Sequence, residues 1–455
     1  MRSFALGFIP LQLLLLMLMG FPSRLAAEEE MGLWDCVEAA VTGHIAVKAG
    51  RWRVEQARNT VEQDRTLFKP DFSFGAHYTA NSYVPKIPLP GRNLPLGGHN
   101  DAGISIEAGH LLYDWGGRRD KLKADQDQQQ SSFESLRALR ETLAFEAGAG
   151  YLRLLAARSE RKIAERSVET ADEHYRHLQA LGSSGLLTYD EVLKGRVHLE
   201  QARLMLSRSA NAEKLARSEL LLRIGVPLTS AAEFADSAGQ IPQPLPSESR
   251  LDSALARRPE LAAYDSRLAS LESMAAGLAS ENKPVLRLFA NGNVARPGID
   301  QFRNEWIGYG RAGIGMSWSF FDWGRKDYAV AKLKAQWEET LANRRILGQQ
   351  IALEVQQASL TAEEAGERIS VAHSGLEAAE EQFRIVRSRF EQGQVTNTQF
   401  IDAEDAQTIS AIEVTRAELD LGLARWQLAY ATGELTARID ERWAEKQTDE
   451  RQDNH

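Results

Sequence analysis

Cysteine is almost absent from this chain of 455 residues, and Cys36 is the only one. A single cysteine forms neither an intrachain disulfide nor a cysteine-based metal cluster, so packing must hold the fold together. Positive charge is also scarce, because 54 lysines and arginines stand against 63 acidic residues and leave a net charge of −9. This balance argues against nucleic acid as a partner.

Long apolar runs are missing except at the N-terminus. There Arg2 precedes an apolar stretch from Phe4 to Gly20, and Leu25 to Ala27 offers a cleavage site before an acidic run. The pattern predicts a signal peptide over residues 1–27. An uncleaved inner-membrane anchor is the less favoured reading, because small residues and then acids follow the apolar run. No later run of eighteen apolar residues predicts a membrane-spanning helix, although membrane β-strands would escape such a search.

Proline is absent between Pro95 and Pro227, and again after Pro297. Proline inside a helix costs about 3 kcal/mol or more, so these two gaps are where long helices are expected. Pro259 stands alone and suits the first turn of a helix.

The chain contains an internal repeat. The segment from Leu112 to Gly116 recurs as Phe320 to Gly324, at an offset of 208 (322 − 114 for the shared aspartates). Further upstream, the Lys-Pro pair ending at Pro70 recurs ending at Pro284, at an offset of 214 (284 − 70). Two copies of one unit therefore lie head to tail, an arrangement that suits a pseudo-symmetric wall or tube better than an enzyme.

Each copy has a long helical segment. From Ile351 to Phe390, apolar residues alternate spacings of four and three, and the counterpart from Leu143 to Gly182 has one charged member, Arg161. A seam of period 3.5 over five heptads is typical of a coiled coil. A helix of about 65 residues from Gly117 would be roughly 100 Å long at 1.5 Å per residue.

Each long helix is followed by a glycine-containing turn, with Gly185 in the first copy and Gly393 in the second. Glycine readily takes the left-handed conformation that ends a helix. Thr188 and Thr396 then offer helix N-caps, with Glu191 and Gln399 three positions on in the capping-box spacing. A second helix returns in each copy, so each copy is predicted to carry a helical hairpin.

The residue pattern changes to a period of two in four segments: 72–79, 103–113, 285–295 and 306–321. These strands reach about the nine to eleven residues that a tilted membrane strand needs. Four strands cannot close a barrel, and open edges are not tolerated in lipid. Either helices cover a soluble sheet, or several chains share one barrel, in which case three chains would supply twelve strands.

The predicted organisation follows from these marks. In chain order it is a signal peptide at 1–27, an N-terminal helix at 28–70, a β-hairpin at 71–113, a long helical hairpin at 114–226, an equatorial linker at 227–250, a helix at 251–284, a β-hairpin at 285–321, a second long helical hairpin at 322–434 and a charged tail at 435–455.

Few residues point to chemistry. His174 and His177 have a spacing that could bind a metal, but no third ligand is evident and a surface pair is favoured. Asp114 and Asp322 each precede a helix, where an aspartate caps the N-terminus, so caps are favoured over catalytic acids. The sequence predicts no catalytic residue, cofactor site or metal site, and therefore no enzyme.

The ordered, duplicated set of motifs resembles the outer membrane efflux protein family, the TolC-like channels. Besides the repeated marks above, the resemblance rests on Leu33 to Ala40, on Arg258 to Leu261 and on the two tips, and it covers roughly residues 33–435. It implies a mainly α protein with a membrane β-barrel portion: a homotrimer whose twelve-stranded barrel lies in outer membrane lipid of a Gram-negative bacterium. Long coiled-coil hairpins would continue the barrel as a periplasmic α-barrel.

The resemblance also implies a function and partners. Such channels conduct drugs, ions or proteins passively, in efflux or type I secretion, from an inner-membrane pump joined by a periplasmic adaptor (membrane fusion) protein. The alternative is that the chain is itself an adaptor or coiled-coil scaffold. Adaptors, however, usually flank a single hairpin with small β-domains.

Two sets of site residues follow from the resemblance. The pore gate would involve an acidic ring at Gln399 and Asp402, of which only Asp402 is acidic, and a latch at Glu191, Phe390 and Val395, where only Glu191 is charged. The adaptor would contact the hairpin tips, at Gly182, Gly185, Leu186, Leu187, Thr188, Gly393 and Thr396.

Overall fold

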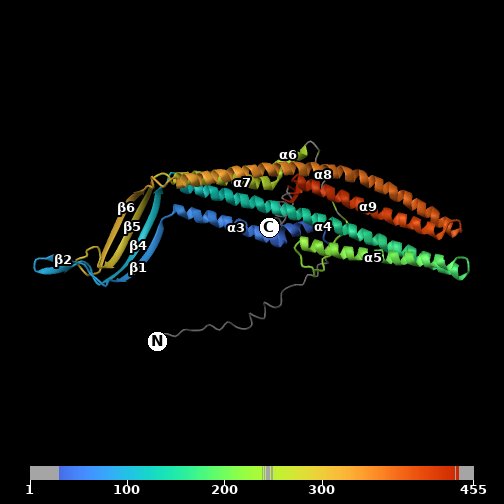
Figure 1. The fold of residues 1–455 in the computed structure, drawn as a ribbon, viewed down its shortest axis with the longest axis horizontal. Coiled ribbons are helices and arrows are strands. Elements are labelled where there is room, and N and C mark those ends of the chain that lie inside the picture. The colour runs from blue at the N-terminus through green and yellow to red at the C-terminus, as the bar shows by residue number, and fades with distance from the viewer. Residues whose placement is uncertain are drawn as a thin grey trace, which may run out of the picture.

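The computed structural model describes residues 30–237, 239, 241, 246, 249–435 and 437–439. The signal peptide expected at 1–27 lies outside the described residues, as does most of the C-terminal tail. The molecule is elongated, with a β-sheet at one end and the tips of two helical hairpins at the other (Figure 1).

Two helical hairpins run from the sheet to the tips. Helices α4 (Gly117–Ser183) and α8 (Arg325–Glu391) each have 67 residues, and the returning helices α5 (Tyr189–Arg223) and α9 (Asn397–Ala431) each have 35. At every one of these boundaries the second copy is displaced by the offset of 208 found in the sequence (325 − 117). The predicted hairpins are therefore confirmed.

The shorter helices of the two copies also correspond, but each predicted single helix is broken in two. Helices α2 (Leu33–Gly43) and α3 (Ile45–Arg65) meet at His44, and a short 3-10 turn (Thr66–Phe68) follows. Helices α6 (Arg250–Arg257) and α7 (Pro259–Ser280) meet at Arg258. Arg258 is extended because the ring of the following proline disfavours the helical conformation before it, and Pro259 then occupies the first turn of α7, as predicted.

The main sheet has four antiparallel strands in the order β1-β4-β5-β6. They are β1 (Asp71–Ala80), β4 (Asn100–Tyr113), β5 (Val285–Arg296) and β6 (Ile307–Ser317). The central β4–β5 pair joins the two copies. The prediction that the last strand reaches 321 is wrong, because Ser317 pairs with Val285, the first residue of β5, and the preceding Pro284 has no N–H to extend the ladder.

The loop between β1 and β4 contains a short hairpin where only a proline-rich loop was expected. Strand β2 (Lys86–Leu89) pairs with β3 (Arg92–Pro95), and Gly91 turns between them with a φ of +85°. Each strand of a two-stranded ribbon is paired along one edge only. Proline, which has no backbone N–H to donate, is tolerated where its nitrogen faces the unpaired edge.

The largest core lies midway along the molecule. Trp426 of α9 is fully buried, packs edge-on against Trp34 with ring centroids 5.5 Å apart, and donates a hydrogen bond to the Phe145 carbonyl at 3.0 Å. Tyr151 of α4 donates to the Ala235 carbonyl at 2.7 Å. Cys36 lies in the same core, where burial and then the nearby Asp35 raise the pKa of its thiol to about 12.

Towards the tips the hydrophobic clusters are small, with Phe383, Phe400 and Ala403 forming the one in the second hairpin. Further from the tips, seam residues Ile351, Val355 and Ala358 are buried, as the coiled-coil pattern predicted. Within the described part of the chain, no helix has the length and apolarity needed to cross a membrane.

Candidate functional site

The two hairpin tips have the same backbone turn. Gly185 and Gly393 have φ angles of +77° and +68°, in the left-handed region expected for them. After α4, Leu186 donates its backbone N–H to the Leu181 carbonyl at 3.0 Å, and after α8, Gln394 donates to the Arg389 carbonyl at 2.9 Å. These bonds satisfy the last carbonyl groups of the long helices, so both turns end their helices by a Schellman motif.

The helix caps beyond the turns differ. Thr396 and Gln399 form a complete capping box, with the Thr396 N–H donating to Gln399 Oε1 at 2.9 Å. The corresponding box expected at Thr188 and Glu191 is wrong, because the Thr188 side chain makes no cap hydrogen bond. The Glu191 carboxylate is held by Lys194 at 3.0 Å instead of reaching back to the cap.

The tips also differ in apolar exposure. At the first tip, Leu186 is 74% exposed, whereas Leu187 is half-buried. Gly182 and Thr188 lie on the same turn, on either side of the two leucines. The second tip presents exposed Gln392 and Gln394 around Gly393. The first tip is therefore the more apolar of the two surfaces.

An aromatic cluster lies just inside the tips, between the two hairpins. The His174 ring of α4 stacks on Phe400 of α9 with centroids 3.8 Å apart, and Phe390 of α8 packs edge-on to it at 5.0 Å. His174 is only 5% exposed, so the expected surface pair is wrong for this residue, although His177 is exposed. The beginning of α9 covers the face of α4 on which His174 lies.

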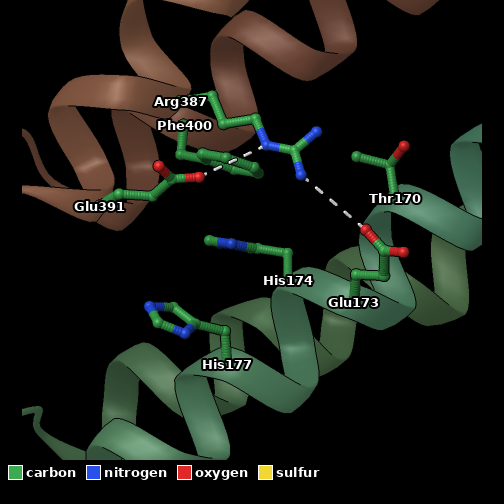
Figure 2. A pocket seen from close by; sticks show the side chains of 7 residues that line it. All are labelled: Thr170, Glu173, His174, His177, Arg387, Glu391 and Phe400. Carbon is green, nitrogen blue, oxygen red and sulfur yellow. Dashed lines mark ion pairs between the residues drawn. The ribbon is translucent and has the colours of Figure 1, made fainter.

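Charged side chains surround this cluster on its solvent side. Arg387 lies 4.0 Å from Glu173 of α4 and 3.7 Å from Glu391, and the three edge a shallow cavity of about 330 Å³ (Figure 2). All three are more than half exposed, so these ion pairs contribute little to stability. In the described part of the chain, no three His, Cys, Asp or Glu side chains are placed to hold a metal.

Three polar contacts join the hairpins, and the two that involve histidine are buried. His174 Nε2 donates to Asn397 Oδ1 at 2.7 Å, since this oxygen can only accept, and Asn397 Nδ2 donates to the Glu191 carbonyl at 3.2 Å. His198 Nε2 of α5 donates to Glu404 Oε2 of α9 at 3.0 Å. The His198 and Glu404 side chains are 6% and 3% exposed.

The two histidines have opposite pKa shifts. Burial lowers the pKa of His174 to about 4, and the nearby His198 and His177 lower it further against the effect of Asn397. Burial also acts to lower the pKa of His198, but the hydrogen bond and charge of Glu404, with the charge of Asp405, outweigh it and raise the pKa. His174 is therefore neutral at neutral pH, whereas His198 keeps its proton to a higher pH than an ordinary histidine does.

The structure places the expected gate residues around this joint. Phe390 lies in the aromatic cluster, Glu191 contributes its backbone carbonyl, and Val395 is half-buried in the turn. Gln399 and Asp402 are both exposed on α9, and the Gln399 amide is used in the cap.

The sequence reasoning missed Asn397, His198 and Glu404. His198 and Glu404 are 206 positions apart, beyond the reach of any local motif. The one available signal is that Glu404 follows Phe400 by four residues and so shares its buried helix face.

Solved structures show which proteins share this fold. The chain is similar to the CmeC outer membrane channel of Campylobacter jejuni, with 16% identity, a TM-score of 0.73 and coverage of 90% of this chain and 88% of that one. It is similar to VceC of Vibrio cholerae (16% identity, TM-score 0.71, coverage 88% and 96%) and to the MtrE channel of Neisseria gonorrhoeae (16% identity, TM-score 0.72, coverage 88% and 88%). The fold is thus that of outer-membrane channel proteins. No curated protein sequence matches significantly.

The family follows from the sequence match. The model of the outer membrane efflux protein family matches residues 37–226 and 251–434, which is most of the chain and includes both copies of the repeat. The chain belongs to this family. It is an outer-membrane efflux channel protein that extends into the periplasm, and the adaptor alternative is not favoured. The members of the family are channels rather than enzymes.

Proposed function

We propose that three copies of this chain form one channel through the outer membrane and the periplasm. The observation that carries the proposal is the open sheet. Strands β1 and β6 each have a single neighbour in the sheet, so each leaves a row of backbone groups unpaired. Lipid does not tolerate such edges, and three sheets joined edge to edge give a closed barrel of twelve strands.

Side chains on the sheet support a membrane location for it. Phe72, Phe74 and Tyr78 of β1 are 69–75% exposed, and Ile314 and Met316 of β6 are 67% and 69% exposed. Large apolar groups at alternate positions along a strand lie on one face of the sheet. That face matches the outward, lipid-facing side of a barrel.

The helices have unpartnered apolar stripes that a neighbouring copy would cover. On α5 the exposed members are Val197, Leu204, Leu215 and Leu222, and on α8 they are Ile346, Leu353, Leu360 and Val371. Spacings of seven and eleven residues return to nearly the same side of a helix, so each set forms a narrow stripe. We infer that α5 of one copy packs against α8 of the next around the tube.

We assign the partners to the two ends of the tube. The tips dock a periplasmic adaptor protein, which joins the channel to an inner-membrane pump, and the channel conducts cargo passively. Leu186 and Tyr189 at the tip of the first hairpin support this assignment, because both are about three-quarters exposed and together they give the turn an apolar surface that suits a protein partner. Asp402 forms the acidic ring inside the tips.

Conductance in planar lipid bilayers tests the proposal. Protein purified from outer membranes should insert and give discrete conductance steps, because a shared barrel leaves a water-filled pore. The separation of outer membranes from soluble periplasmic protein, which precedes the recording, is part of the test. A chain recovered as soluble periplasmic protein, or one that is inserted in the bilayer but gives no conductance, would contradict the proposal.

A further inference from the structure

We propose that the His198–Glu404 and His174–Asn397 contacts together form a pH-responsive latch that ties α9 to the first hairpin and sets how readily the tips part. The latch residues are these four and no others. The inference rests on the proposed channel function, because parting of the tips would open the periplasmic end. It assigns a role to two buried histidines that neither the cap nor the coiled-coil seam explains.

The latch joins α9 to both helices of the first hairpin. Asn397 is the first residue of α9 and bonds to His174 of α4, whereas Glu404 lies seven residues further and bonds to His198 of α5. Seven residues are about two helical turns, so the two contacts lie on the same side of α9, roughly 10 Å apart. Two such contacts restrain both the position and the rotation of the helix near its tip.

The latch belongs to the interface between the two copies and not to the repeated unit. At the offset of 208, His174 corresponds to Gln382, His198 to Ala406, Asn397 to Tyr189 and Glu404 to Arg196. None of the four residues recurs in the other copy. The four latch residues are therefore not part of the duplicated pattern. They serve the interface between the two hairpins, to which each hairpin contributes different residues.

Loss of charge on His198 weakens the latch at high pH. The titratable groups that face His198 are Glu404 and Asp405 of α9, at 3.0 and 3.8 Å, and His174 of α4. The raised pKa means that the folded state retains this proton above the ordinary value of 6.5. The stabilisation is thus fully present below pH 6.5 and is lost as the pH rises through the raised pKa. Glu404, only 2% exposed, then faces an uncharged histidine, and a buried acidic group that loses its cationic partner destabilises the contact.

Protonation of His174 weakens the latch at low pH. The ring lies between Phe400 and Phe390. Burial and then the nearby His198 and His177 lower its pKa, and the charged side chains that line the cavity beside it are Glu173, Arg387 and Glu391. Because its pKa is lowered to about 4, the unfolded chain binds this proton more readily between pH 6.5 and 4. Stability is therefore lost as the pH falls through that window. The latch is tightest around pH 6.5 and loosens on either side.

The test records the open probability of the reconstituted channel between pH 4 and 9. Wild-type channels should open more often at both extremes. His198→Gln keeps a hydrogen-bond donor but cannot be charged. The open probability of this variant at pH 7 should therefore already equal that of the wild type at alkaline pH, and it should not rise further towards pH 9. His174→Gln should remove the acidic rise. His373→Gln changes an exposed histidine of α8 that lies near Glu418 and touches none of the latch residues, so it is the matched control and should retain the wild-type profile.

Two further measurements keep the inference separate from the channel proposal. Joining His198→Cys to Glu404→Cys with a short bis-maleimide, in a Cys36→Ala background, should abolish the pH-dependent opening. Hydrogen exchange in mild detergent, expressed as protection factors because the intrinsic rate itself rises with pH, should show weaker protection over the first turns of α9 at pH 9 than at pH 6.5. His198→Gln should remove this difference. A wild-type pH profile in His198→Gln overturns the latch, as do protection factors that are the same at both pH values, even in a chain that never conducts.

Discussion

Gly185 and Gly393 lie 208 positions apart and hold the same left-handed backbone conformation, with φ angles of +77° and +68°. Among the described residues, no heavy atom outside the glycine and its chain neighbours lies within 4 Å of where a Cβ atom would stand at either position. The requirement for glycine is therefore set by the backbone alone and not by crowding. This makes the two tips suitable for a test of local strain.

Substitution of Gly185 or Gly393 by valine should strain the turn by roughly 1–2 kcal/mol, because an L-residue is disfavoured in this conformation. Export of cargo should fall while insertion into the outer membrane is retained. Gly375→Val is the matched control, since Gly375 is exposed in α8, has open space around it and has no positive φ. Export at the wild-type level in both tip variants, at matched protein levels, would show that the tips are not the docking site.

The two hairpins differ in their caps, and this gives a paired prediction. Thr396→Ala should destabilise the start of α9 by about 1 kcal/mol, because it removes the side-chain bond to the Gln399 N–H. Thr188→Ala should have almost no effect, since Thr188 makes no cap hydrogen bond. Hydrogen exchange over the first turns of α9 and α5 measures both effects. Equal changes in the two variants would contradict the structural difference.

Asp402 is exposed on α9, and we expect three copies of it to face the pore near the tips. Negative charge concentrated in a narrow pore favours cations. Asp402→Asn should reduce the preference for cations, and Asp402→Arg should reverse it. Reversal potentials under a salt gradient provide the measurement, with Glu380→Gln, an exposed acid of α8, as the control. Unchanged selectivity in both Asp402 variants, with the assembly intact, would place this residue outside the pore.

Gly148 allows α4 to approach Trp426 of α9 in the central core. A Cβ atom at residue 148 would lie 2.3 Å from Trp426 Cε2, so Gly148→Ala requires the fully buried ring to move. Overpacking of this kind costs about 1–3 kcal/mol. The melting temperature should therefore fall, whereas Gly366→Ala on the exposed face of α8 should leave it unchanged or raise it. A wild-type melting temperature in Gly148→Ala would show that α4 and α9 are less tightly packed than described.

The long hairpins and the main strands could be predicted from the sequence, whereas the breaks in the shorter helices and the end of β6 could not. The segments without proline and the apolar seam from Ile351 to Phe390 were sufficient to predict the long helices. The alternation of apolar and polar residues was sufficient to predict the main strands. The breaks at His44 and Arg258 were both missed: no proline follows His44, and Pro259 was placed in a first helical turn without the preceding helix being ended at Arg257. The end of β6 at Ser317 depends on where its partner β5 begins, which is a property of pairing and not of the strand itself.

The site was only partly predictable for the same reason. The glycine turns are local and were found. The burial of His174 depends on α9, more than two hundred residues later in the chain, and the partner of His198 is equally distant. The contacts between the two hairpins could therefore be identified only from the structure.

The most direct test of the account is the mass of the purified protein in mild detergent. Edge strands β1 and β6 and the exposed stripes of α5 and α8 require neighbouring copies of the chain. Light scattering or native mass spectrometry, corrected for bound detergent, should give three times the mass of the mature chain. A stable, folded monomer under these conditions would contradict the proposed channel.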